Sequence, residues 1–135
     1  MKKLFLLCSV GINILFQCGL VWGQDDALDV LYLDGKSGFV LLPSQVIEGL
    51  DQATIEAWVW WESFPKWARV FDFGVEGNAA LVQNEKTSST LNFSIYDRKS
   101  KRYRIQKSRA VTKGEWYHIA AVCGRDGMFF FIQGN

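Results

Sequence analysis

The chain has 135 residues, of which 15 are basic, 14 are acidic and 49% are hydrophobic. This length allows one domain with its own core. The net charge of +1 creates no global positive field, so we expect no nucleic-acid partner.

The first 23 residues have the pattern of a secretory signal peptide. Lys2 and Lys3 precede an apolar run that extends to Val21, and Gly23 supplies the small residue expected just before a cleavage site. We therefore expect residues 1–23 to be a signal peptide that directs the protein to the cell surface or the medium.

Two alternatives to a signal peptide remain open. A transmembrane anchor is disfavoured because the apolar run lies at the extreme N-terminus behind two lysines. A lipoprotein attached at Cys18 is disfavoured because Gln17 occupies a position that needs a small residue.

Cleavage would leave a domain of residues 24–135 with no membrane insertion. It would carry 14 acids and 13 bases, a net charge of −1. Cys123 would be its one cysteine, so the domain has no disulfide and depends on its core for stability.

The rest of the chain has short strand-like runs separated by turn residues. The expected strands span residues 30–33, 39–42, 53–62, 68–73, 79–83, 90–96, 101–107, 115–123 and 128–133. Ser44 is expected to cap a single helical turn within residues 44–51, and Asp126-Gly127 is a strong hairpin signal. About nine strands without an amphipathic helix predict an all-β, antiparallel sandwich or barrel.

The run at residues 53–62 is the clearest strand. One side of its period-2 repeat carries Ile55, Ala57, Val59 and Trp61, and the other carries Thr54, Glu56, Trp58 and Trp60. Because both sides carry bulky apolar groups, we expect this strand at the centre of a sheet.

Six segments in order resemble one family. They are Tyr32-Leu33-Asp34-Gly35, Phe39-Val40-Leu41-Leu42-Pro43, Thr54-Ile55-Glu56-Ala57-Trp58-Val59, Arg69-Val70-Phe71-Asp72-Phe73-Gly74, Trp116-Tyr117-His118-Ile119-Ala120-Ala121-Val122 and Phe131-Ile132-Gln133-Gly134. Together they resemble the laminin G-like, concanavalin A-like jelly rolls, above all the bacterial members appended to secreted enzymes and surface proteins. The resemblance runs from about residue 27 to the last residue, and implies an antiparallel β-sandwich of jelly-roll type. Gln133 departs from it, since Asn is commoner before that glycine.

The family pattern continues beyond the strand at 128–133. Several further strands follow there, and the last of them pairs beside the strand at 30–33. We therefore expect residues 24–135 to be a jelly roll that lacks its last strands, from a truncated gene or an incomplete gene model. The alternative is a complete small domain that closes its edge by dimerising.

Catalytic patterns are weak. Glycosidases of concanavalin A-like fold carry two or three acids at alternate positions of one strand, whereas Glu56 and Glu62 are six residues apart with no acid between them. His118 is the only histidine, and we interpret it as a sheet residue bonded locally. We expect no enzyme activity.

Calcium is the one cofactor to consider, since many members of the resembled family hold it at the rim of the sandwich. Asp72 and Asn78 are the candidate ligands, with Glu76, Asn84 and Asp126 as further oxygen donors. The simpler interpretation is that Arg69, three residues away, or backbone amides hold Asp72.

Ligand contacts are predicted at two places. Trp67, in the loop Phe64-Pro65-Lys66-Trp67-Ala68-Arg69, is the tryptophan expected to reach solvent, where a flat ring can stack on sugar.

The second place is a run of seven bases between residues 98 and 109. Among them Arg102 and Arg104, close to Tyr96, are expected to point outward together. They would bind sulfated or uronic glycans or an acidic protein face. The simpler interpretation is a solvated hairpin whose charge prevents aggregation at its edge.

These patterns favour a secreted or surface-displayed, non-catalytic binding module for carbohydrate or extracellular protein ligands, with an edge-mediated dimer as an option. The alternative is a truncated remnant of a larger extracellular protein without independent activity.

Overall fold

A computed structural model describes residues 2–7, 30–35, 37–75 and 78–133, which form two antiparallel sheets and one 3-10 turn. The strands are β1 (Lys2–Leu7), β2 (Leu31–Leu33), β3 (Ala53–Trp61), β4 (Arg69–Val75), β5 (Asn78–Asn84), β6 (Leu91–Tyr96), β7 (Arg102–Lys107), β8 (Trp116–Gly124) and β9 (Gly127–Ile132). The turn η1 spans Ser44–Val46. The predicted all-β antiparallel sandwich of jelly-roll type is confirmed.

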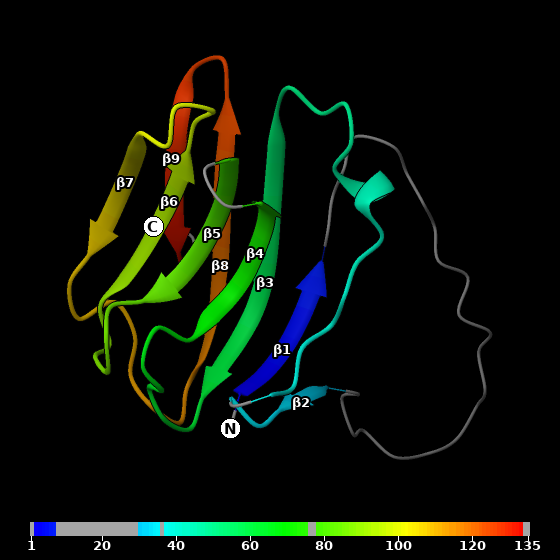
Figure 1. Cartoon of the computed structure of the whole chain (residues 1–135). Coiled ribbons are helices and arrows are strands. Elements are labelled where there is room, and N and C mark those ends of the chain that lie inside the picture. The colour runs from blue at the N-terminus through cyan, green and yellow to red at the C-terminus, as the bar shows by residue number, and fades with distance from the viewer. Residues whose placement is uncertain (1, 8–29, 36, 76–77, 134–135) are drawn as a thin grey trace.

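The two sheets lie one in front of the other (Figure 1). The five-stranded sheet has the order β2-β1-β3-β8-β9, and the four-stranded sheet has the order β4-β5-β6-β7. The side chains that the sheets share between them make the core, so each sheet keeps one outer face for solvent and ligands.

The central position predicted for the strand at 53–62 is confirmed. β3 pairs antiparallel with β1 on one side and with β8 on the other. Its inward residues Val59 and Trp61 are 1% and 0% exposed, whereas outward Trp58 is 40% exposed. The period of two therefore sorts this strand into one core side and one surface side.

Aromatic rings from both sheets fill the core. Phe93 of β6 is 1% exposed and lies 6.4 Å from Phe71 of β4 and 6.1 Å from Phe130 of β9, between ring centroids. Trp61 contacts Tyr117 at a centroid distance of 6.4 Å. Edge and tilted contacts of this kind add to the burial energy of the rings.

Two local predictions are wrong. Residues 39–42 form no strand, and Phe39 and Leu41 are 77% and 83% exposed. A strand needs a neighbour to bond its backbone, and no strand of the described residues pairs with this segment. Ser44 caps nothing, because the turn begins directly after Pro43 and Ser44 is its first residue.

The N-terminal residues Lys2–Leu7 form β1, between β2 and β3. Residues 8–23 lie outside the described residues, so the signal peptide remains a prediction. No helix within the described ranges is long and apolar enough to cross a membrane.

Candidate functional site

The strand expected at residues 101–107, which carries Arg102 and Arg104, is β7. It lies at one edge of the four-stranded sheet. Arg102 pairs with Tyr96 of β6, and Arg104 pairs with Ser94. Both arginines extend from the outer face, as predicted. The alternate residues of the strand are Tyr103 and Ile105. Ile105 packs against the core, whereas Tyr103 is 43% exposed with the Lys101 ammonium 5.0 Å from its ring.

Arg102 is held in place by its neighbours. Its Nε and Nη2 donate to Ser94 Oγ at 3.1 and 2.9 Å, and Nη2 also donates to Asn92 Oδ1 at 3.3 Å. The guanidinium carbon lies 5.7 Å from the Tyr96 ring centroid. Because Asn92 and Ser94 are fully buried, they fix the guanidinium before any ligand arrives.

The network continues toward Arg104. Asn92 Nδ2 donates to Glu85 Oε2 at 3.2 Å, and Arg104 Nη1 lies 3.6 Å from the same oxygen. This network contains one carboxylate and two arginines, so the face stays basic. In the described part of the chain, no acceptor bonds Nη1 of Arg102, which can donate to a ligand oxygen.

The hairpin before β7 places Arg102 beside Tyr96. Asp97 Oδ1 accepts hydrogen bonds from the backbone N–H groups of Lys99 and Lys101 at 2.8 and 2.9 Å. Such an Asx contact stabilises a turn locally.

We expect Asp97→Ala to lower the free energy of unfolding by about 1–2 kcal/mol, because two backbone hydrogen bonds lose their acceptor. Urea denaturation of the variant and the parent chain measures the change. Asp126→Ala, in the other exposed turn, is the control and should shift the midpoint less. Equal shifts would contradict the role of the Asp97 side chain.

Trp67 does not join the arginines. It lies beside β4, at the opposite edge of the four-stranded sheet, and is 36% exposed as predicted. Its backbone N–H bonds Lys86 O at 3.0 Å. Trp67 lines a groove of about 790 Å³ together with Asp72, Phe39 and Leu41.

The structure favours the simpler interpretation of Asp72, whose carboxylate contacts the Arg69 guanidinium. Asn78 begins β5, but its side chain lies outside the described residues, as does Glu76. Asn84 is buried and donates to the carbonyls of Pro65 and Lys86. Among the described residues no group of three or more His, Cys, Asp or Glu side chains could hold a metal ion.

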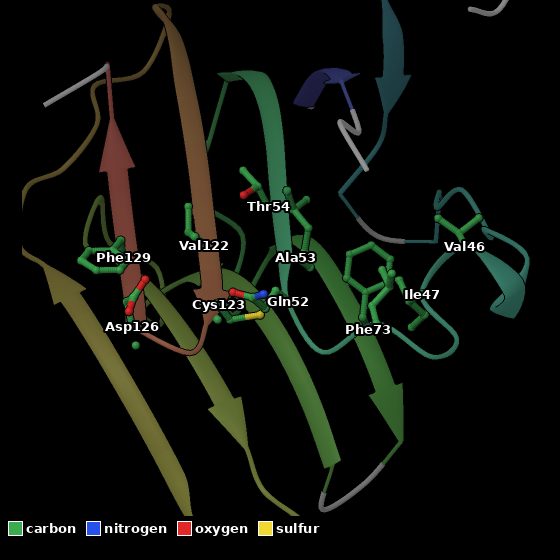
Figure 2. Close-up of a pocket in the computed structure, with 14 residues that line it drawn as sticks. Val46, Ile47, Gln52, Ala53, Thr54, Phe73, Val122, Cys123, Asp126 and Phe129 are labelled. Atoms are coloured by element: carbon green, nitrogen blue, oxygen red, sulfur yellow. The ribbon is translucent and has the colours of Figure 1, made fainter. Parts of the chain in front are cut away.

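A smaller cavity of about 270 Å³ lies at one end of the sandwich (Figure 2). Ile47 and Phe73 meet on one side of it, and Cys123 lies beside Gln52 on the other. Cys123 is half-buried and packs against the core.

Sequence reasoning missed a second surface, the outer face of the five-stranded sheet. Trp58 is 40% exposed there, and its ring centroid lies 5.3 Å from that of His118. His118 Nε2 lies 3.4 Å from Glu56 Oε2 on the neighbouring strand β3. The alternation of 53–62 separates Trp58 from Val59 and Trp61, but with apolar groups on both sides it did not indicate which side faces solvent. Trp67 was the tryptophan expected there, and Trp58 is at least as exposed.

Glu62, the other acid considered in the search for a catalytic pair, directly follows β3. Its carboxylate accepts a hydrogen bond from the Tyr32 hydroxyl of β2, and this bond raises the pKa of Tyr32 above its usual value. Glu62 and Glu56 therefore have different partners.

A comparison with protein families gives one match. The family model Laminin_G_3, described as the concanavalin A-like lectin/glucanases superfamily, matches residues 34–135. Searches of curated proteins and of solved structures gave no significant match.

Proposed function

Since this chain belongs to the concanavalin A-like lectin/glucanases superfamily, we propose that it is a secreted or surface-displayed, non-catalytic module that binds carbohydrate or protein ligands. Its first ligand class is acidic glycans, with sulfate or carboxylate groups. They bind the basic arm, defined here as Arg102 and Arg104 of β7 with Tyr96 of β6.

The fixed guanidinium of Arg102 carries this proposal. Most surface arginines lose side-chain entropy when they bind, but Arg102 already has three hydrogen bonds to Asn92 and Ser94. The two N–H groups of its Nη1 are left to donate to the oxygens of a carboxylate or sulfate. Arg104 lies two residues along the same strand face, so neighbouring charges of a polymer can bind both.

The placement of the acids supports a non-catalytic role. A retaining glycosidase needs two carboxyl groups about 5–5.5 Å apart across the scissile bond. Glu56 faces His118 on the five-stranded sheet, Glu62 bonds Tyr32, and Glu85 bonds Asn92. Each of these carboxylates has a structural partner.

Heparin, a sulfated glycan, provides the test with the full chain. We expect retention on immobilised heparin that falls as salt rises. Arg102→Ala with Arg104→Ala should weaken binding about 30-fold, because two charge-assisted contacts are lost.

The matched control is Arg98→Ala with Lys99→Ala, which removes the same charge from the adjacent turn. It should weaken binding only a few-fold, through long-range electrostatics. If both double variants elute alike, net charge alone drives retention and the Arg102 site is wrong. Retention that is unchanged at high salt would also exclude the arginines.

A further inference from the structure

Within the described residues the two sheets have four free edges, at β2 and β9 of the larger sheet and at β4 and β7 of the smaller one. A free edge presents unpaired backbone N–H and C=O groups. Native proteins protect such an edge with charged residues, with irregular pairing or by keeping the strand short. An edge without this protection can pair with a strand of another chain.

Three of the four edges are protected. β2 is only three residues long. β4 carries Arg69 and Asp72, and its register with β5 is irregular directly after Arg69. β7 carries Arg102, Arg104 and Lys107. An incoming strand at these edges would find few backbone groups to bond or would have to desolvate charges.

β9 is the unprotected edge. Its sequence, Gly127-Met128-Phe129-Phe130-Phe131-Ile132, has no charged residue and no proline, and its register with β8 is uninterrupted. Phe129 and Phe131 are 45% and 40% exposed on the outer face of the sheet. Six residues of this composition form the kind of edge that pairs with other chains.

The backbone of β9 has bonding groups left over. In an antiparallel pair, alternate residues of a strand bond the neighbouring strand. Gln133 N–H donates to His118 O at 2.7 Å, so the residues in step with Gln133 bond β8. The N–H and C=O groups of the alternate residues face the free edge, and these residues are Met128, Phe130 and Ile132.

The strand is complementary to a second copy of itself. If two β9 strands pair antiparallel about Phe130, each Phe130 bonds the other, and Met128 bonds Ile132 of the second copy. The pairs between them place Phe129 opposite Phe131 of the second copy, where side chains approach most closely. Aromatic pairs at such positions stabilise a sheet, and the strand has no charge to meet its own copy.

Strand β7 limits the strength of this association. It contacts β9 and lies at the same side of the molecule, as the edge of the other sheet (Figure 1). Two copies joined through β9 therefore bring their basic β7 strands toward each other. Salt screens this repulsion, so the association should tighten as salt rises.

We propose that β9 pairs with β9 of a second copy of this chain and joins the two five-stranded sheets into one. The pairing uses the same surface on both copies, so it stops at a dimer, and the protected edges do not extend it. Because one short strand buries less than about 1,000 Å², the dimer is weak, with a dissociation constant of about 10–100 µM. This inference does not depend on the proposed binding of acidic glycans.

Sedimentation velocity of the full chain between about 1 and 300 µM tests the proposal. We expect a monomer–dimer equilibrium that tightens between about 0.05 and 0.5 M salt. Hydrogen exchange followed by mass spectrometry locates the junction. Peptides that cover β9 should exchange more slowly at high protein concentration, and peptides that cover β4 should not change.

Two double variants test the register. Phe129→Lys with Phe131→Lys puts like charges opposite each other across the junction and should weaken the dimer more than about tenfold. Phe129→Lys with Phe131→Glu removes the same two rings but puts opposite charges there, so it should dimerise at least about tenfold more tightly than the first variant. Trp58→Lys is the control, because Trp58 is 40% exposed on the same face but lies on β3, away from the edge. It should leave the dimer unchanged.

Circular dichroism and the melting temperature establish that each variant is folded. The proposal is overturned if the full chain stays monomeric over the whole range, if it forms species larger than a dimer, or if the two double variants associate alike. Loss of the dimer in folded Trp58→Lys would also overturn it, because the copies would then stack through the sheet face. Heparin retention is measured separately, so absence of the dimer leaves the test of the basic arm standing.

Discussion

Replacing Phe93 by alanine is expected to lower the free energy of unfolding by about 3–5 kcal/mol, the largest effect of any single substitution considered. Phe93 is 1% exposed and lies between Phe71 of the four-stranded sheet and Phe130 of the five-stranded sheet. Truncation removes the contact area of a whole ring and leaves a cavity that neither sheet can close alone.

Urea denaturation followed by tryptophan fluorescence measures this change. Phe129→Ala is the control, because Phe129 is 45% exposed on the outer face and its loss should cost under about 1 kcal/mol. Comparable losses in the two variants would mean that the sheets do not pack through Phe93.

Removing residues 1–23 is expected to have an effect of similar size. β1 pairs with β3 from Lys2–Trp61 to Leu7–Glu56, and with β2 on its other side. At about 1 kcal/mol for each inter-strand hydrogen bond, a chain that begins at Gln24 should lose on the order of 5 kcal/mol, a large part of the stability of a domain. Its bare β3 edge should also pair with other chains.

Sedimentation velocity and thermal unfolding of the two chains, side by side, test this expectation. We expect concentration-dependent association and a lower melting temperature for the shorter chain. Leu4→Pro in the full chain is the second variant: it removes one donor from β1 and should cost about 3 kcal/mol without removing the segment. Two chains of equal stability and size would show that β1 contributes little to the sheet.

The sequence predicted most of the fold because alternation determines which side of a strand is buried. Trp58 lies on the opposite side of the strand from Val59 and Trp61, as the period of two required, although which side is the core was not predicted. The strand expected at 39–42 failed because apolar composition does not supply a pairing partner. β1 was missed because a basic, apolar N-terminus has the same composition whether it serves as a leader or as a strand.

The candidate site was predicted less completely. The neighbours Arg102 and Arg104 were found because they share a strand face, a local property. Asn92 and Ser94, which fix Arg102, lie on another strand, and their role depends on the register of β6 with β7. Likewise Trp58 and His118 are far apart in sequence and meet through the pairing of β3 with β8.

That last pairing has a consequence for how the chain reaches its native state. Ala53 pairs with Cys123 and Trp60 with Trp116, so the centre of the larger sheet joins segments separated by four other strands. Contacts this distant require a long loop to close before they stabilise anything, and folding is expected on the millisecond-to-second scale typical of β-sandwiches. During synthesis the β3 segment emerges long before β8, so its apolar side stays exposed until nearly the whole chain has left the ribosome.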